Sequence, residues 1–207
     1  MLEVNEIFYS IQGESSFAGM PCVFIRLTGC NLRCAYCDTR DAYENGSFMS
    51  IADILQHIGD YSCPLVEITG GEPLFQNDTP DLANFLLQSG YRVLLETNGS
   101  LDINRVSKSV IRIMDIKCPD SGESDNMDWD NLAKITSTDE VKFVISSYKD
   151  FRWAANVTRE NSLTEKATVI FSPTYNVLAG NLLAQWILAG KLNVRLQIQL
   201  HKILSVK

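Results

Sequence analysis

The chain has 207 residues, of which 45% are hydrophobic and 21% charged, and its formal net charge is −7. A chain of this length can bury roughly 70% of its unfolded surface, so we expect one domain over residues 1–207 with a core of its own. The negative charge and the absence of a long Lys or Arg run exclude a nucleic acid backbone as the main partner.

Short runs rich in β-branched and aromatic residues alternate with runs of helical periodicity. The predicted strands are Cys22–Leu27, Leu65–Thr69, Val93–Glu96, Ile111–Ile116, Glu140–Ile145, Thr168–Phe171 and Arg195–Leu200. The predicted helices are Ser50–Ile58, Pro80–Gln88, Trp153–Glu160 and Leu178–Ala189, and Ser50 and Thr79-Pro80 supply start signals for the first two. Strands that alternate with helices indicate βαβ units, so we predict an α/β fold with a mostly parallel sheet or a partial barrel.

Polar and glycine residues follow several predicted strands. The run Thr69-Gly70-Gly71-Glu72-Pro73 ends one strand, Glu96 ends the next, and Asp115 and Lys117 end the third. In parallel folds the functional residues gather beyond the carboxyl ends of the strands. The two glycines let a backbone approach a ligand closely, and Glu72 offers a carboxylate beside it, although a glycine pair also suits a tight turn. Glu96 suits a helix cap as well as a pocket. Their recurrence at successive strand ends nevertheless indicates a site at one edge of the sheet.

Three cysteines, Cys30, Cys34 and Cys37, lie within one short loop. Closed zinc sites and ordinary iron–sulfur clusters both take four protein ligands, so three cysteines leave one position open. We favour a cluster with one open iron. A Cys3His zinc site completed by His57 or His201 is the alternative, although both histidines are far away in the sequence.

The other cysteines, Cys22, Cys63 and Cys118, are scattered and form no paired framework. The first residues lack the basic start and apolar run of a secretory signal, and no run approaches the ~18 apolar residues of a membrane span. We therefore expect a cytoplasmic protein without a membrane segment, in a reducing compartment where thiolates stay available.

The CxxxCxxC spacing of Cys30–Cys37, followed by Gly70-Gly71-Glu72-Pro73, resembles the radical S-adenosylmethionine (SAM) superfamily. The resemblance implies a [4Fe–4S] cluster whose open iron is chelated by the amino and carboxylate groups of SAM. It also implies that the glycine turn contacts that amino group and that reductive cleavage yields a 5′-deoxyadenosyl radical. No side chain is then expected to act as a catalytic group, because the cofactor carries the radical.

Further segments indicate one family within this superfamily: Glu6–Glu14, Phe24–Leu32, Cys37–Thr39, Ile68–Leu74, Glu96–Gly99 and Arg195–Lys202. Together they closely resemble the 7-carboxy-7-deazaguanine synthase family of the queuosine pathway. The resemblance implies a carbon–nitrogen lyase that converts 6-carboxy-5,6,7,8-tetrahydropterin to 7-carboxy-7-deazaguanine by hydrogen abstraction, radical ring contraction and loss of ammonia. It also implies a modified partial (β/α) barrel, Mg²⁺, a homodimer, and an electron donor such as flavodoxin or ferredoxin.

The same resemblance assigns the site residues. The expected contacts to SAM come from Tyr36, Cys37, Asp38, Gly71, Asp115, Ile116 and Lys117. The expected contacts to the pterin come from Ile11, Gln12, Gly13, Arg26, Thr69 and Lys207, the last through its terminal carboxylate. Thr39 is the expected hydroxyl ligand of Mg²⁺.

The chemistry of Arg26 and Thr39 suits the roles assigned to them. Arg26 lies on an apolar strand and needs a partner, and a substrate carboxylate can bind a guanidinium through two hydrogen bonds. Mg²⁺ accepts few protein oxygens, which suits Thr39. Capping of a turn is the structural alternative for Thr39, and fraying of the chain end is the alternative for Lys207.

For two segments, the sequence does not decide between alternative local structures. The family usually has glycine where this chain has Ser15, and the change removes a residue that adopts positive φ easily. In the terminal run, Arg195, Gln197, Gln199 and His201 alternate with apolar residues. Their polar face can meet solvent or the pocket, and His201 can be structural or bind substrate.

Two other functional classes stay open. A glycyl-radical activase also uses CxxxCxxC but acts on a protein partner, and the segments around Gln12 and Gln199 argue against it. The second of these hypotheses is a module that binds zinc or a cluster and has no enzymatic activity.

Overall fold

The computed structural model describes residues 1–207 and contains one nine-stranded sheet, of order β3-β1-β2-β4-β5-β6-β7-β8-β9. At one edge, β1 (Leu2–Ile11) pairs antiparallel with both β3 (Ser47–Met49) and β2 (Pro21–Leu27). From β2 onward every neighbouring pair is parallel. The remaining strands are β4 (Leu65–Gly70), β5 (Arg92–Thr97), β6 (Ile111–Asp115), β7 (Glu140–Ile145), β8 (Thr168–Pro173) and β9 (Arg195–Leu196). Their carboxyl ends therefore lie on one side.

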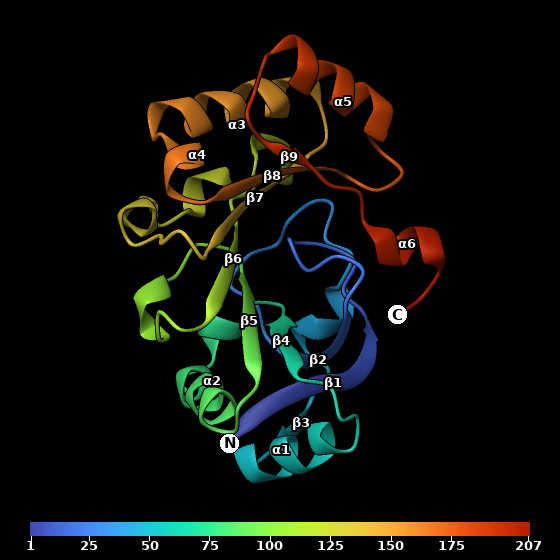
Figure 1. The fold of residues 1–207 in the computed structure, drawn as a ribbon, viewed down its shortest axis with the longest axis vertical. Coiled ribbons are helices and arrows are strands. Elements are labelled where there is room, and N and C mark those ends of the chain that lie inside the picture. Colours follow the sequence, from blue (N-terminus) through green and yellow to red (C-terminus); the bar gives the residue numbers. More distant parts are fainter.

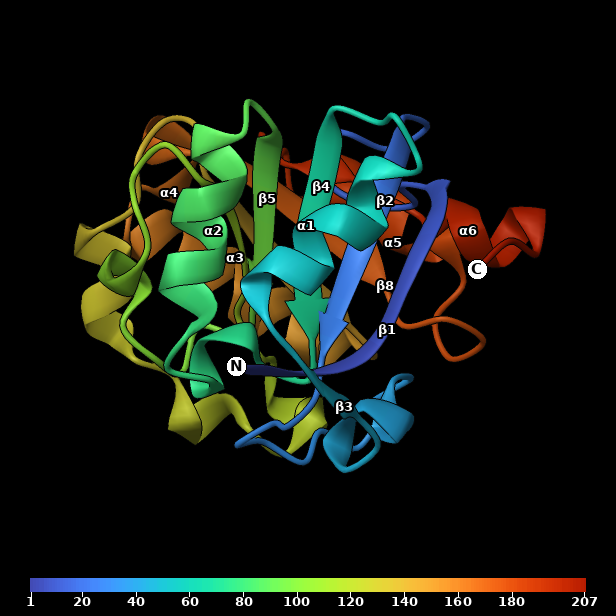
Figure 2. The ribbon, with the colours of Figure 1, turned by 90° about the horizontal axis from the view of Figure 1, so that it is seen from below.

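The sheet curls, and the larger helices lie on its outside (Figure 1). Figure 2 shows α1 and α2 in front of β4 and β5, while α3, α4 and α5 cover the other end of the sheet. The helices are α1 (Ile51–Gly59), α2 (Thr79–Gln88), α3 (Tyr148–Glu160), α4 (Leu163–Lys166), α5 (Gly180–Ala189) and α6 (Leu200–Leu204). Short 3-10 turns cover Arg40–Tyr43, Pro73–Phe75, Ile103–Arg105, Pro119–Ser121, Ser124–Asn126 and Trp129–Ala133.

Local sequence signals explain where the helices begin. Ser50 accepts a hydrogen bond from the Asp53 amide, and the Asp53 carboxylate accepts one from the Ser50 amide, which is a capping box. Pro80 lies in the first turn of α2, where a missing N–H costs nothing. Ser147 caps α3 through the Asp150 amide, so this helix begins at Tyr148 rather than at the predicted Trp153.

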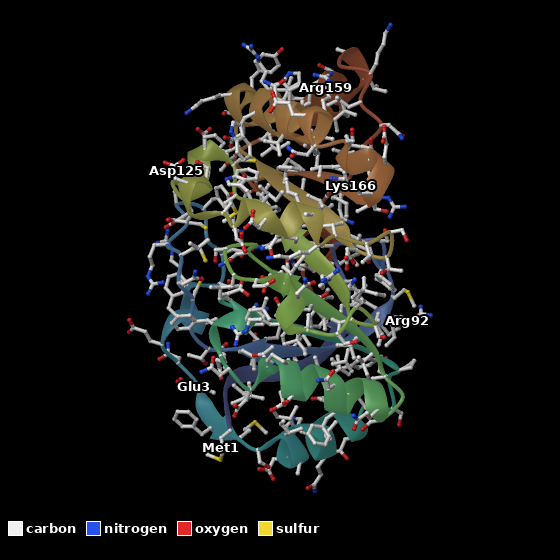
Figure 3. All side chains as sticks on the ribbon, turned by 90° about the vertical axis from the view of Figure 1, so that its left-hand side faces the viewer. Met1, Glu3, Arg92, Asp125, Arg159 and Lys166 are labelled. Atoms are coloured by element: carbon white, nitrogen blue, oxygen red, sulfur yellow. The ribbon has the colours of Figure 1, made fainter.

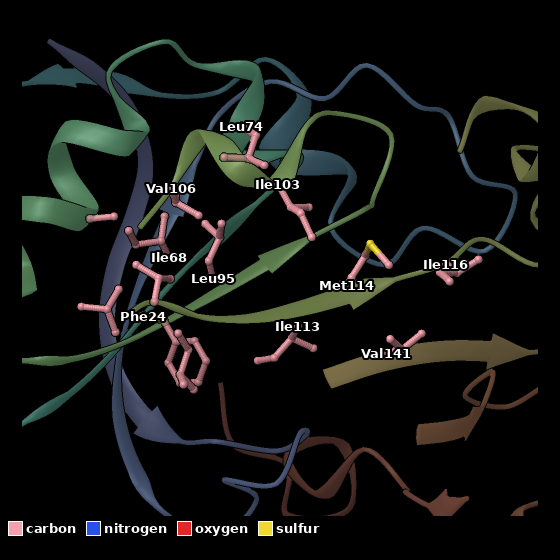
Figure 4. Close-up of a cluster of buried hydrophobic side chains, with 14 of the residues drawn as sticks. Phe24, Ile68, Leu74, Leu95, Ile103, Val106, Ile113, Met114, Ile116 and Val141 are labelled. Carbon is pink, nitrogen blue, oxygen red and sulfur yellow. The ribbon is translucent and has the colours of Figure 1, made fainter. Parts of the chain in front are cut away.

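The alternation of side chains in each central strand separates a core from a pocket. Ile68 and Leu95, from β4 and β5, are fully buried in the apolar cluster shown in Figure 4. Glu67 and Thr69 alternate with these core residues on β4 and line the cavity on the inner side of the curl. The same strands therefore supply both the core and a polar inner wall.

Six of the seven predicted strands are confirmed within one or two residues, and all four predicted helices exist. The prediction for Arg195–Leu200 is wrong beyond Leu196. The Gln197 amide makes one last bond to the Phe171 carbonyl of β8, after which the side chains of Gln197 and Gln199 bind the loop after β1 and α6 begins at Leu200. The strand β1 was not predicted, and a register shift between Val4 and Glu6 interrupts its alternation.

Charged side chains such as Arg159, Lys166 and Asp125 project from the outer surface (Figure 3). None of the helices is both long and apolar enough to cross a bilayer.

Candidate active site

A cavity of about 300 Å³ lies on the inner side of the curled sheet. It is lined by nearly all of the residues that the sequence assigned to the site: Ile11, Gln12, Gly13, Arg26, Cys30, Cys34, Tyr36, Cys37, Asp38, Thr39, Thr69, Gly71, Asp115, Lys117 and Lys207. Ile116 is the exception. Its side chain is in the core and its amide binds the Lys142 carbonyl, so any ligand contact from Ile116 is left to its main chain.

The cysteine loop follows β2 and faces this cavity. Cys30, Cys34 and Cys37 are unpaired and half-buried. The Cys30 sulfur accepts hydrogen bonds from the Leu32 amide at 3.4 Å and from Asn98 Nδ2 at 3.9 Å. N–H donors to sulfur are the contacts with which proteins tune iron–sulfur clusters, so the loop fits such a group.

No three His, Cys, Asp or Glu side chains converge as a single metal ion requires. Of the two histidines considered for a Cys3His zinc site, His57 lies on α1 outside the cavity, with its ring 6.2 Å from that of Tyr61, whereas His201 lines the cavity. Burial raises the pKa of Cys34 to about 11, so this thiol gives up its proton when iron binds.

The loop after β6 braces the cysteine loop. The Ala35 amide donates to the Ser121 carbonyl at 2.9 Å, and the Arg33 amide donates to Glu123 Oε1 at 2.6 Å. Arg33 itself donates from one terminal nitrogen to the carbonyls of Cys30 and Leu32. These hydrogen bonds support the path of the cysteine loop.

The glycine turn after β4 differs from expectation in one respect. Glu72 is fully buried, does not line the cavity, and accepts hydrogen bonds from the Leu74 and Asn98 amides and from Thr97 Oγ1. Its carboxylate ties the turn to the end of β5 and is not offered to a ligand. A Cβ on Gly71 would lie 2.2 Å from the Gly29 carbonyl oxygen, so glycine is needed for the turn to pass the cysteine loop.

Two side-chain oxygens at the cavity are buried without a hydrogen-bond partner: Tyr36 Oη and Asp115 Oδ1. The other Asp115 oxygen binds Lys117 Nζ at 2.8 Å. Burial opposes the charge on Lys117, but Asp115 raises the pKa of the lysine, so Lys117 keeps its positive charge. Buried oxygens without partners are costly, and a polar ligand such as SAM would satisfy them.

Lys142, in the middle of β7, connects three elements of the cavity. Its Nζ pairs with Glu14 at 2.8 Å, with Glu96, and with Asp115 at 3.7 Å. Burial alone would lower the pKa of Lys142, but these carboxylates raise it well above its usual range. Lys142 in turn lowers the pKa of Glu14 against the effect of burial.

The expected substrate residues line the cavity from β1, β2 and β4, from the loop after β1 and from the end of the chain. Arg26 Nε pairs with Glu6 at 2.9 Å, while the two terminal nitrogens of Arg26 have no protein partner. Glu6 also binds the Lys207 ammonium, and the Lys207 carbonyl oxygen accepts from Ser10 Oγ at 2.6 Å. Thr69 Oγ1 donates to Glu96 at 3.3 Å.

Thr39 precedes a 3-10 turn but makes no side-chain capping bond. Its hydroxyl, 3.8 Å from the Cys37 sulfur, is thus available as an oxygen ligand, and the capping alternative is not realised. The neighbouring Asp38 carboxylate binds Lys202 Nζ at 2.6 Å.

The run from Gln197 to His201 closes the cavity against the loop after β1. Gln197 accepts from the Ser15 amide and donates to its carbonyl, both at 2.7 Å, and the Leu200 amide donates to the Gly13 carbonyl. Ser15 has φ 61°, so the position does need positive φ, and the Gln197 amide holds the serine there. A Cβ on Gly13 would collide with the His201 ring, which lines the cavity.

Residues 24–115, which span β2 to β6, match the radical SAM superfamily. The 7-carboxy-7-deazaguanine synthase of Chlorobaculum tepidum is 44% identical to this chain, with 97% of this chain and 93% of the relative covered. That of Koribacter versatilis is 42% identical, with 97% and 96% covered. The chain belongs to the 7-carboxy-7-deazaguanine synthase family.

The crystal structure of QueE from Escherichia coli has the same fold, with a TM-score of 0.76 at 23% identity, and the likeness covers 97% of this chain and 94% of that one. Streptococcus suis SuiB bound to its precursor peptide is a more distant neighbour, with a TM-score of 0.57 at 15% identity over 82% of this chain and 46% of that one. The predicted α/β class and the partial barrel of the radical SAM type are confirmed.

For this family member, sequence reasoning missed the residues that organise the cavity from within. Lys142 and Glu67 were read as parts of strands, although each is a charged residue inside an apolar run. That contrast was the available signal, because a charge in the middle of a buried strand needs a partner. Glu123 carried no such signal, since acidic residues in polar loops are ordinary.

Proposed function

We propose that this chain is a 7-carboxy-7-deazaguanine synthase of queuosine biosynthesis, a radical SAM lyase that converts 6-carboxy-5,6,7,8-tetrahydropterin to 7-carboxy-7-deazaguanine and ammonia. The observation that carries the proposal is that the cysteine loop, the glycine turn and Arg26 face one cavity, in a chain 44% identical to a synthase of that name. The whole chain would act as one radical SAM domain, in keeping with its single sheet.

Cys30, Cys34 and Cys37 would hold the [4Fe–4S] cluster. When bound, the cluster and SAM supply a carbon radical that removes hydrogen from C6 of the substrate. Asp115, Tyr36 and the backbone of Gly71 would orient SAM, with Asp38, Ile116 and Lys117 beside it. The buried oxygens of Asp115 and Tyr36 that lack partners support this placement.

Arg26 would bind the pterin carboxylate through its two free terminal nitrogens while Glu6 fixes Nε, so the guanidinium presents its bidentate edge to the substrate. Ile11, Gln12, Gly13 and Thr69 would read the ring, and Lys207 would contact the substrate from the end of the chain. Thr39, whose hydroxyl has only the Cys37 sulfur as a partner, would offer its oxygen to Mg²⁺ next to the substrate. Closure of the loop after β1 against residues 197–201 would keep water from the reacting atoms.

The proposal extends to the setting of the reaction. A one-electron donor such as flavodoxin or ferredoxin would reduce the cluster, and six unpaired cysteines suit the reducing cytoplasm. The protein would act as a homodimer, which sedimentation of the purified protein would test.

The deciding experiment is anaerobic incubation of the reconstituted protein with SAM, a reductant, Mg²⁺ and the tetrahydropterin. We expect 7-carboxy-7-deazaguanine and ammonia in equal amounts, and loss of both the brown absorbance and SAM cleavage when any cluster cysteine becomes alanine. A colourless, zinc-loaded protein, or full SAM cleavage by the triple cysteine variant, would refute the proposal. A glycyl-radical activase would instead modify a protein added in place of the pterin.

A further inference from the structure

Glu67 is a buried carboxyl group that the proposed mechanism does not use. It lies in the middle of β4, only 3% exposed, beside Phe24 of the paired strand β2. Its Oε2 accepts a hydrogen bond from Gln12 Nε2. Its Oε1 has no protein partner and is not among the oxygens that the protein fully encloses, so it opens to the cavity that Glu67 lines.

The surroundings of Glu67 favour the neutral acid. The titratable groups that face it are Glu14 of the loop after β1, Cys22 of β2, Glu96 of β5 and Lys142 of β7. Lys142 is already paired with both of the other glutamates, so it cannot neutralise a third carboxylate. Burial and the charge of Glu96 raise the pKa of Glu67 well above its usual range.

The hydrogen bond from Gln12 determines where the proton of Glu67 lies. Oε2 acts as an acceptor toward Gln12 Nε2, and the Gln12 oxygen is itself engaged by the Glu14 amide at 3.0 Å, so Gln12 cannot turn to accept a proton. The acidic proton therefore belongs on Oε1, which then points an O–H donor into the cavity. Glu96, the nearby carboxylate, is engaged at its two oxygens by Thr69 and Lys142, and the apolar Phe8, Phe24 and Ile113 that line the same cavity offer this donor no acceptor.

We propose that Glu67 donates a hydrogen bond from its carboxyl group to an acceptor atom of the bound heterocycle, a ring nitrogen or the ring carbonyl. The inference rests on the proposed function, because a pterin presents such acceptors. Glu67 is then a specificity residue of the substrate pocket, in addition to the carboxylate clamp formed by Arg26.

The test measures binding of 6-carboxypterin to the cluster-loaded protein, without turnover, from quenching of pterin fluorescence. Glu67→Gln keeps an acceptor for Gln12 and an N–H donor toward the cavity, so its affinity should stay within about threefold of the wild type at low pH. Glu67→Leu removes the donor and should weaken binding roughly tenfold or more. Iron content and the thermal midpoint of each variant show that it is folded and loaded.

The pH profile separates direct contact from simple support of Gln12. As the pH rises through the raised pKa of Glu67, the wild type loses its donor, so its affinity should fall while that of Glu67→Gln stays level. Ionisation would strengthen the bond from Gln12, so a supporting role predicts no such fall and would overturn the inference. Affinity that rises with pH, or a Glu67→Leu variant that binds like the wild type, would also overturn it. A wild type that neither binds 6-carboxypterin nor converts the tetrahydropterin would refute the proposed function as well.

Discussion

The guanidinium of Arg26 is held by the protein at Nε and has no protein partner at its two terminal nitrogens. Glu6 holds Nε, and the terminal nitrogens point to the cavity without a protein partner. We expect Arg26→Ala to raise KM for the tetrahydropterin by roughly 10- to 100-fold, because one charged hydrogen-bonding partner contributes about 1–3 kcal/mol. Steady-state kinetics would measure this change, with iron content and SAM cleavage in the absence of pterin left intact.

Arg26→Lys is the matched control for that experiment. It keeps the positive charge near Glu6 but loses the two-point geometry, so its KM should lie between those of the wild type and the alanine variant. An unchanged KM in Arg26→Ala would show that the substrate carboxylate binds elsewhere.

For single residues, the sequence identified those that would bind a cluster or substrate better than those that hold the site in shape through protein–protein hydrogen bonds. Cys30, Cys34 and Cys37 were recognised because their spacing has one chemical meaning, and all three face the cavity. Glu72 was misjudged because the sequence does not show that three donors from β5 and its own turn already occupy the carboxylate. The use of a polar group depends on partners that the fold brings from elsewhere.

Among the elements, the short segment after β9 departs most from its predicted form. Alternation favoured a strand to Leu200, and Gln199 and His201 do line the cavity, yet beyond Gln197 no main-chain ladder continues and side chains make most of the contacts. Periodicity reports which residues share a face. It does not report whether a backbone partner lies beside that face.

Gln197 should therefore be a major support of this end of the fold. It is 7% exposed and satisfies both main-chain groups of Ser15. We expect Gln197→Leu to lower the free energy of unfolding by about 1–3 kcal/mol, because the Ser15 amide and carbonyl lose their partners. Urea denaturation would measure it.

Two controls accompany Gln197→Leu. Ile198→Ala changes an exposed neighbour and should cost well under the glutamine variant. Ser15→Gly keeps the main-chain bonds to Gln197; it loses the bond from the Phe17 amide to Ser15 Oγ but relieves the positive φ, so its net effect should also be small. Equal destabilisation in all three variants would remove the special role of Gln197.

A buried ion pair joins β6 to the segment before β7. Arg112 is fully buried and binds Asp139 through Nε at 2.9 Å and a terminal nitrogen at 2.5 Å. Burial would raise the pKa of Asp139, but Arg112 and the Thr136 amide outweigh it and lower the pKa. The stabilisation is therefore present above the unfolded pKa of about 4 and is lost as the pH falls below it.

We expect Asp139→Asn to destabilise the protein by about 3–5 kcal/mol at neutral pH, because Arg112 remains charged and buried. The wild type should lose stability between about pH 5 and about pH 3, and the variant should lose less over that interval. Urea unfolding at several pH values gives both results. The double variant Arg112→Met with Asp139→Leu should cost less than Asp139→Asn alone, and the opposite order would contradict this account.

For the whole molecule, the sequence predicted the parallel sheet and the position of its site, but not the contacts that close the cavity. The alternation of elements was enough to predict a parallel sheet with its site at the carboxyl ends. It could not show that β1 pairs antiparallel with β2 and β3 at the end of the sheet opposite β9, because this pairing depends on contacts distant in the sequence. Nor could it show that residues 197–202 return to that edge.

Residues 13–16 contact residues 195–200 along what we call the seam, and this contact has a consequence for motion. Hydrogen bonds join the two segments, with no strand ladder between β1 and β9. Such a seam can part without breaking the sheet, so it is the least costly place for the molecule to open. Hydrogen–deuterium exchange should detect this as fast exchange of the Ser15 and Leu200 amides, at a time when the amides of β4 and β5 are still protected. A ligand that touches both Gly13 and His201 should slow the exchange at the seam, and equal exchange rates at the seam and in the central strands would argue that it does not open by itself.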